Sequence, residues 1–201
     1  MLLTVLDLLG VFAFALSGGM RGVERRLDLF GVVLVAFVAA TMGGILRDLL
    51  IGATPPAAIG SWSYVATSTV AGLLCFFAHK VIARLSAPVA VFDAIGLGFS
   101  VAVGTCKALD IGLSPIMAAL LGMLTAIGGG LARDILTART PMVLQRDVYA
   151  LAALAGAVFV AFGNFAGIPC NVTAPLGGML ATTLRLVAMR HNWQLPIAKP
   201  D

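Results

Sequence analysis

Seven long apolar stretches limit what this chain can fold into. Each has about twenty residues, which is the length that an α-helix needs to cross the hydrocarbon core of a bilayer. None shows the alternation of period two that marks a strand. Only helices and closed barrels satisfy their backbone groups in lipid, so we predict seven transmembrane helices. The predicted spans are residues 2–19, 29–51, 62–82, 88–105, 114–136, 148–166 and 174–190.

Charged residues are too scarce for a water-soluble surface. They make up 11% of the 201 residues, whereas soluble domains carry about 25%. This excludes a soluble enzyme and a nucleic-acid-binding protein, although the net charge is +4. We expect an all-α membrane protein with a single transmembrane domain over residues 1–201, because seven spans leave no room for a separate soluble domain.

The positive charges outside the spans indicate an orientation. One side of the predicted membrane holds ten of the eleven, and the other side holds only Lys107. Cytoplasmic loops carry the excess of Lys and Arg, so we predict an external N-terminus and a cytoplasmic C-terminus. The ten are Arg21, Arg25, Arg26, Lys80, Arg84, Arg139, Arg146, Arg185, Arg190 and Lys199.

The chain contains an internal repeat at an offset of 86 residues. When residues 7–55 are placed over 93–141 without gaps, 13 of 49 positions are identical. Each copy holds three spans, and because three is odd the second copy must be inverted in the membrane. We predict repeat one at about 2–82 and repeat two at about 88–166. A seventh helix at about 174–190 lies outside the repeat and is expected to serve packing or assembly.

The motif Gly-Gly-x-x-Arg-Asp occurs in the second and fifth spans. The copies begin at Gly43-Gly44 and Gly129-Gly130, and Gly128 extends the second. Adjacent glycines permit a kink or a short unwound stretch, which lipid tolerates only where it is buried in protein or lines a water-filled cavity. The alternative is that the glycines allow close helix crossing while each arginine makes a structural ion pair.

The intramembrane charges form two sets that the repeat relates to each other. The outer set is Asp7, Arg47, Asp48 and Lys107, and the inner set is Asp93, Arg133, Asp134 and Arg21. We expect Asp7 to pair with Arg47. By symmetry, Asp93 should pair with Arg133. Adjacent residues on a helix point apart, so Arg47 is not expected to pair with Asp48. The near-neutral totals do not establish ion selectivity.

The remaining residues give no sign of catalytic chemistry. Cys75, Cys106 and Cys170 lie within or beside apolar stretches without a CxxC spacing. We interpret them as small packing residues, with a metal or redox site as the weaker alternative. No HExxH motif and no Ser-His-Asp set is found. We therefore expect neither an enzyme nor a resident metal.

At these residues the sequence resembles the prokaryotic branch of the TRIC family, the trimeric intracellular cation channels. The resemblance covers essentially the whole chain and rests on the repeat and the duplicated Gly-Gly-x-x-Arg-Asp. It implies a homotrimer in a bacterial-type inner membrane, with a pore for monovalent cations, chiefly potassium, between the repeats of each protomer. It further implies bound lipid, no cofactor beyond permeant K⁺ or Na⁺, and gating by Lys107, to which Arg21 corresponds.

A second function remains open at this point. Some bacterial relatives are regarded as transporters of a small amino acid such as glycine. Inverted repeats and broken helices occur in transporters as well, and paired Arg and Asp side chains could bind a carboxylate and an ammonium group. The sequence therefore predicts a cation channel and keeps a glycine transporter as its alternative.

Overall fold

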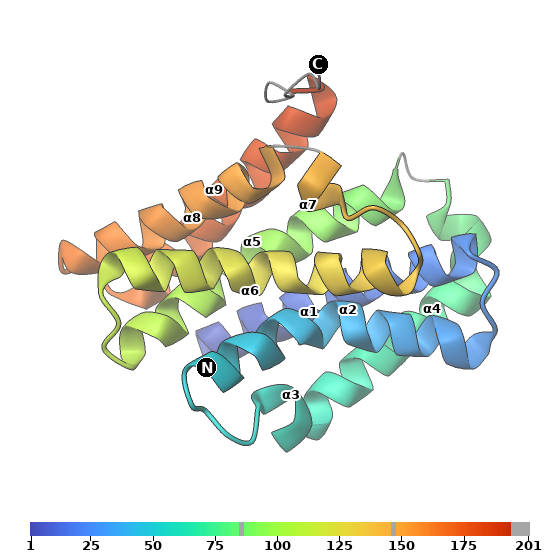
Figure 1. The fold of residues 1–201 in the computed structure, drawn as a ribbon, viewed down its shortest axis with the longest axis horizontal. Coiled ribbons are helices and arrows are strands. Elements are labelled where there is room, and N and C mark those ends of the chain that lie inside the picture. Colours follow the sequence, from blue (N-terminus) through green and yellow to red (C-terminus); the bar gives the residue numbers. More distant parts are fainter. Residues whose placement is uncertain (85–86, 146–147, 194–201) are drawn as a thin grey trace, which may run out of the picture.

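The fold was examined in a computed structural model, which describes residues 1–84, 87–145 and 148–193 (Figure 1). Over these residues the chain is entirely helical, apart from its turns. Seven helices are long and apolar enough to cross a membrane, which confirms the predicted number of spans. The helices are α1 Leu2–Glu24, α2 Leu29–Leu50, α3 Ala57–Gly60, α4 Trp62–Ile82, α5 Pro88–Asp110, α6 Pro115–Leu136, α7 Met142–Gln145, α8 Val148–Phe165 and α9 Cys170–Arg190.

Some helix ends differ from the prediction. Helices α1 and α5 continue past residues 19 and 105 to Glu24 and Asp110, so each carries charges in its last turns. Arg21 and Lys107 find acidic partners, Glu24 and Asp48, so their charges do not end the helices. Helix α9 begins at Cys170 instead of 174, and Pro175 lies inside it. The short helices α3 and α7 were not predicted, and each follows a Thr-Pro turn.

The second helix of each repeat starts with the same kind of cap. Asp28 precedes α2 and accepts a hydrogen bond from Gly31 N at 2.7 Å. Ser114 precedes α6 and accepts from Met117 N at 3.5 Å. Side-chain oxygens at this position satisfy a free N–H group of the first turn. The two caps are 86 residues apart, so the repeat extends to how its helices begin.

Helices α1 and α5 cross at the centre of the molecule and run in opposite directions (Figure 1). Gly10 of α1 lies against Ser100 of α5. Phe14, one turn further along α1, lies against Gly96, one turn earlier in α5. Helices α2 and α6 are likewise antiparallel, since Gly43 faces Thr125 and Gly129 faces Ala39. These contacts exchange under the offset of 86, as expected for an inverted repeat.

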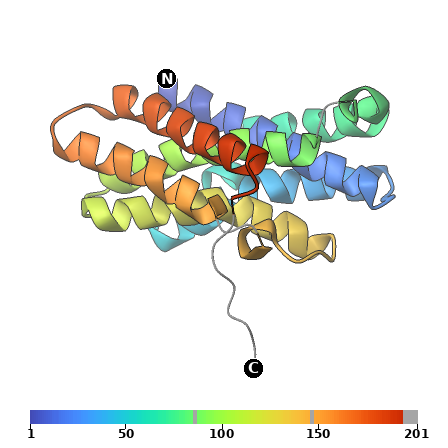
Figure 2. The same ribbon diagram turned by 90° about the horizontal axis from the view of Figure 1, so that it is seen from above.

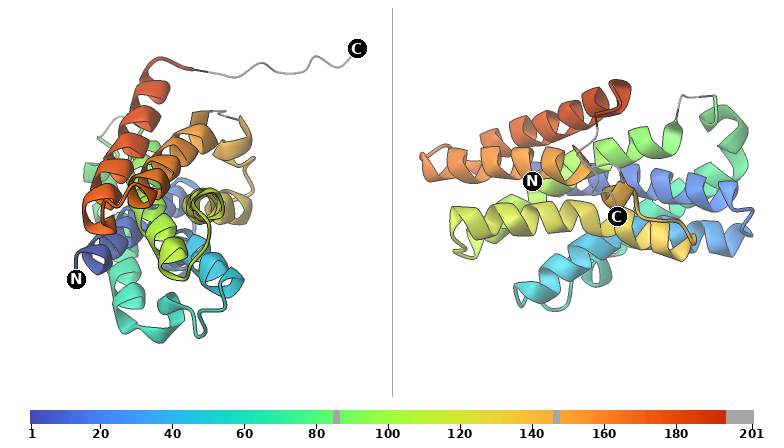
Figure 3. Two further views of the ribbon diagram at one scale, coloured as in Figure 1. Left: turned by 90° about the vertical axis from the view of Figure 1, so that its left-hand side faces the viewer. Right: turned by 45° about the horizontal axis from the view of Figure 1, so that its top comes forward.

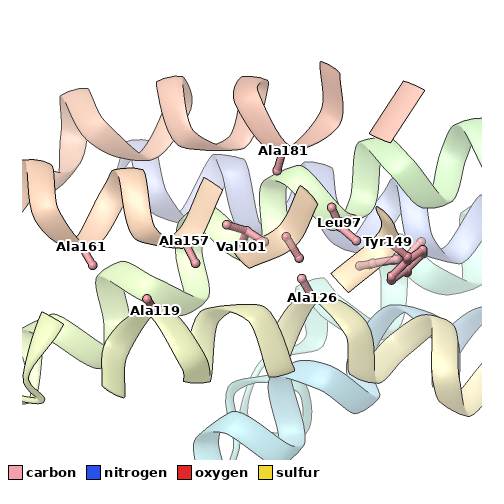
Figure 4. Close-up of a cluster of buried hydrophobic side chains, with 10 residues drawn as sticks. Leu97, Val101, Ala119, Ala126, Tyr149, Ala157, Ala161 and Ala181 are labelled. Atoms are coloured by element: carbon pink, nitrogen blue, oxygen red, sulfur yellow. The ribbon is translucent and has the colours of Figure 1, made fainter. Parts of the chain in front are cut away.

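Helix α9 packs on the second half of the chain. It lies beside α8 and α5 (Figure 2), on the opposite side of the bundle from α4 (Figure 3). Helix α8 also packs on α6, where small side chains make the contact close: Ala119 and Ala126 of α6 face Ala157 and Ala161 of α8 (Figure 4). Helices associate in lipid by this kind of close packing. Large apolar residues such as Phe30, Phe77 and Phe165 lie exposed on the outside.

Candidate functional site

Two groups of ionisable side chains lie between the repeats, and we name them after the predicted orientation. The outer cluster comprises Asp7, Arg47, Asp48, Tyr64 and Lys107. The inner cluster comprises Arg21, Asp93, Arg133, Asp134, Tyr149 and Arg185. Most of these side chains are buried in the protomer. Ionisable groups are costly inside a membrane and usually functional, so these clusters are the candidate site.

Asp48 is the centre of the outer cluster. Its Oδ1 accepts from Arg47 Nε at 2.8 Å and from Lys107 Nζ at 2.7 Å. Its Oδ2 accepts from Ala57 N at 2.9 Å, which ties α3 to the end of α2. Asp48 is 1% exposed, whereas a third of the Lys107 side chain remains exposed. Lys107 of repeat two therefore reaches an outer acid of repeat one.

Arg133 is the centre of the inner cluster and is fully buried. Its Nε donates to Asp134 at 2.9 Å, and Asp134 also accepts from Met142 N at 2.9 Å. Its second nitrogen, Nη1, donates to Asp93 at 2.5 Å and to Ser17 Oγ at 2.6 Å. The predicted pair of Asp93 and Arg133 is confirmed. Ser17 belongs to α1, so this network joins the two repeats.

Two predictions about the ion pairs are wrong. Arg47 does pair with Asp48, because its long side chain turns so that Nε donates to the carboxylate of the next residue. No ion pair joins Asp7 to Arg47 within the described residues. Asp7 instead accepts a hydrogen bond from the Tyr64 hydroxyl group of α4.

Two tyrosines belong to the site and were not predicted from the sequence. Tyr64 lies in α4 and Tyr149 in α8, the third long helix of each repeat. The Tyr149 hydroxyl lies next to Gly130 and Asp93. The chain contains two tyrosines, 85 residues apart. That near match to the repeat offset is the signal that could have identified them.

Arg185 was predicted to be one of the cytoplasmic charges outside the spans, and this is wrong. It lies within α9 and is 1% exposed. Its guanidinium carbon is 4.7 Å from the centre of the Tyr149 ring, a favourable cation–π arrangement. The seventh helix therefore adds a charge to the inner cluster in addition to its packing contacts. Arg21 forms an ion pair with Glu24 at 2.6 Å.

The motif glycines lie where helices meet, in helices without an unwound stretch. Helices α2 and α6 are continuous through Gly43-Gly44 and Gly128–Gly130, so neither has an unwound stretch, and a kink at these glycines stays a prediction. A Cβ atom on Gly43 would overlap the Thr125 carbonyl oxygen, and one on Gly129 would overlap that of Ala39. These two glycines therefore permit the close crossing of α2 and α6. Gly44 and Gly130 face the charged side chains.

The outer half of the site contains open space. A cavity of about 20 Å³ is lined by Asp7, Thr41, Gly44, Arg47, Ser100 and Thr125. Tyr64 also lines this cavity. A second cavity of about 160 Å³ is lined by Asp7 and Tyr64 as well, together with Lys107 and Asp110. At the inner end, Arg21, Asp134 and Arg139 line a cavity of about 120 Å³. The smallest of these cavities has room for one water molecule.

The cysteines correct another expectation. Cys106 of α5 and Cys170 of α9 form a disulfide bond, whereas the sequence analysis treated both as packing residues. Cys75 has a free thiol group and is buried against α1. The described part of the chain contains no group of three or more His, Cys, Asp or Glu side chains that could hold a metal ion.

The sequence is similar to known membrane proteins over most of its length. A family model described as "Glycine transporter" matches residues 4–80 and 90–164. A UPF0126 membrane protein of Deinococcus radiodurans is 38% identical, over 96% of this chain and 91% of the relative. The UPF0126 inner membrane protein YadS of Escherichia coli is 30% identical, over 98% and 96%.

Solved structures resemble the whole chain. One solved structure, described as "Structural basis for conductance through TRIC cation channels", has a TM-score of 0.90 and 32% identity. The match covers 98% of both chains. The TRIC trimeric intracellular cation channel orthologue from Rhodobacter sphaeroides has a TM-score of 0.89 and 31% identity, over 95% of this chain and 98% of that one. The fold is therefore the TRIC fold, and it belongs to channels, not enzymes.

Proposed function

Since this chain belongs to the UPF0126 family of multi-pass bacterial membrane proteins and has the TRIC fold, we propose that it is a cation channel. The observation that carries the proposal is the cavity between the two repeats, lined by Asp7, Thr41 and Ser100. Oxygen atoms of this kind replace part of the hydration shell of a cation. The pathway for ions would run between α1 and α5, from the outer cluster to the inner one.

Potassium is the proposed main permeant ion, and sodium a further one. The cavity holds one water-sized particle, which suits a monovalent cation that has lost most of its hydration shell. The outer cluster alone carries two acids and two bases. The net charge of the outer cluster therefore depends on the position of Lys107. Its side chain is a third exposed and flexible, whereas Arg47 is buried.

Lys107 is the proposed gating residue. Its ammonium group bridges to Asp48 at 2.7 Å and lies next to the cavity that contains Asp7 and Asp110. A positive charge at this mouth repels an entering cation. Movement of the Lys107 head away from Asp48 would remove that barrier. A membrane potential acts on such a charge with about 2.3 kcal/mol per 100 mV for a full crossing.

The assembly is proposed to be a homotrimer, as described for the Rhodobacter sphaeroides relative. Each protomer has its own cavity between repeats, so each would conduct separately. Membrane lipid is a further proposed partner. An apolar cavity of about 390 Å³ between α1, α5 and α9, with Phe99 and Met179 in its lining, is large enough to take part of an acyl chain.

The alternative function is transport of a small amino acid such as glycine, which the description of the matching family model supports. Asp7 and Arg47 both line the cavity without pairing to each other, so they could bind an ammonium and a carboxylate group. The cavity is too small for an amino acid in this conformation, which favours the channel.

Flux measurements on purified protein in liposomes distinguish the two functions. We expect potassium flux that needs no added substrate and occurs in discrete steps when single molecules are recorded. Saturable uptake of glycine without unitary currents would establish the transporter and overturn the channel. Empty liposomes treated in the same way provide the control for leakage.

A further inference from the structure

One face of α1 connects the two clusters. Asp7, Gly10, Phe14, Ser17 and Arg21 follow one another at intervals of three and four residues, so they lie on one side of the helix. Asp7 belongs to the outer cluster and Arg21 to the inner one, and Phe14 lies midway. This face therefore borders the proposed pathway over its whole length.

The equivalent face of α5 carries the same pattern with one important difference. At the offset of 86 its residues are Asp93, Gly96, Ser100, Val103 and Lys107. Ser100 takes the place of Phe14, and its side chain lines the outer cavity. The middle of the pathway therefore has a small hydroxyl side chain on α5 and a large apolar ring on α1.

The Phe14 ring is tightly packed between helices. A Cβ atom on Gly96 would lie 2.7 Å from the ring, and one on Gly129 would lie 3.8 Å from it. The ring therefore lies at the crossing of α1, α5 and α6, packed with Leu97, and it is 2% exposed. Gly96 has no side chain, and this allows the ring to lie there.

Burial differs between the two halves of the site at four related pairs of positions, whereas the Arg-Asp residues of both motif copies are buried. Asp7, Gly44, Tyr64 and Ser100 are half-buried in the outer half, whereas Asp93, Gly130, Tyr149 and Phe14 are buried in the inner half. One turn further along α1, Ser17 is bonded to Arg133, which also holds Asp93. The change from half-open to closed thus falls at Phe14.

We propose that Phe14 closes the inner half of the pathway as an apolar gate, while Ser100 keeps the outer half hydrated. An apolar constriction stops ions by excluding the water that they need. Rotation or displacement of one ring would admit water to Ser17 and the Arg133–Asp93 pair. This proposal rests on the proposed function, because it assumes that the pathway runs between the repeats.

The test exchanges the two equivalent residues and measures both water access and ion flux. Water access is measured as labelling of a cysteine introduced by Ser17→Cys, in a Cys75→Ser background that removes the free thiol. The label is a water-soluble cationic thiol reagent added from the outer side. We expect no labelling when Phe14 is present and labelling in Phe14→Ser. Potassium flux in liposomes should rise severalfold in Phe14→Ser and fall in Ser100→Phe.

Phe12→Ser is the matched control, because it removes the same ring from the same helix on the side that packs against the α1, α2 and α4 core. It should change neither labelling nor flux. If Phe14→Ser does not assemble, Phe14→Ala, which retains helix preference, replaces it under the same readings.

The outcomes separate the gate from the channel. Labelling of Ser17→Cys with Phe14 in place, or no labelling in an assembled Phe14 variant, would overturn the gate. Labelling that appears in Phe14→Ser without any potassium flux would support the gate and contradict conduction.

Discussion

Lys107 is the residue whose charge the account depends on most. In Lys107→Gln, Asp48 keeps its bonds to Arg47 Nε and Ala57 N, so the folded protein should lose no more than about 1 kcal/mol, as for a partly exposed ion pair. Open probability should rise and voltage dependence weaken, because the cationic head is gone while its length is kept. Single-channel recording at both polarities measures both quantities.

Lys80→Gln is the control for this substitution, since Lys80 is exposed at the far end of α4 and should not affect gating. Wild-type open probability and rectification in Lys107→Gln would show that Lys107 has no part in gating.

Some contacts of single residues were predictable, and others were not. The pair of Asp93 with Arg133 was predicted from charge and from the repeat, whereas the same reasoning failed for Asp7 and Arg47. The bond from Arg47 to Asp48 was missed because the rule for neighbouring helix positions concerns Cβ directions, and the arginine side chain is long enough to turn back. The cation–π contact of Arg185 with Tyr149 depends on how α9 packs, which a single sequence does not reveal.

At the scale of the helices, the two glycines of one motif should respond differently to alanine. Gly43→Ala places a methyl group on the Thr125 carbonyl of α6, so α2 and α6 must separate and thermal stability should fall by about 1–3 kcal/mol. Gly44→Ala meets no atom closer than 3.7 Å. It should assemble normally and reduce flux, because the added methyl group narrows the cavity. Thermal unfolding in detergent and liposome flux measure the two effects.

The equivalent substitutions in the second repeat provide the comparison. Gly129→Ala should resemble Gly43→Ala, since it meets the Ala39 carbonyl. Equal stability of Gly43→Ala and Gly44→Ala would contradict the packing role and favour the flexible helix that the sequence suggested.

The positions of the helices were largely predictable, because about twenty apolar residues in lipid have few alternatives. The helix ends were less predictable. Charges in the last turns of α1 and α5 do not end these helices, because the charged side chains find partners. The unwinding expected at Gly43-Gly44 is absent for a related reason. Propensity favours a break there, but the backbone of α6, which cannot be located from local sequence, packs against the glycine and stabilises the helix.

At the scale of the whole molecule, the fold supports the grouping of the basic connections at one end, and which end is cytoplasmic remains a prediction. Arg25 in the first connection donates to the Ala138 carbonyl after α6, at 3.1 Å, so these two basic connections share one end of the bundle. Reporter fusions after Arg26 should therefore read cytoplasmic, and a fusion after Thr54 should read external. If both fusions reported the same side, the three-span repeat and its inversion would be wrong.

The central claim is that cations cross each protomer between its two repeats, and chemical modification of one pathway residue tests it most directly. Ser100→Cys in the Cys75→Ser background would be recorded as single channels in a planar bilayer containing potassium. A cationic thiol reagent should lower the unitary current of each pore that reacts, and an anionic reagent of similar size should lower it less. A unitary current that stays unchanged after complete modification of Ser100→Cys would contradict the account.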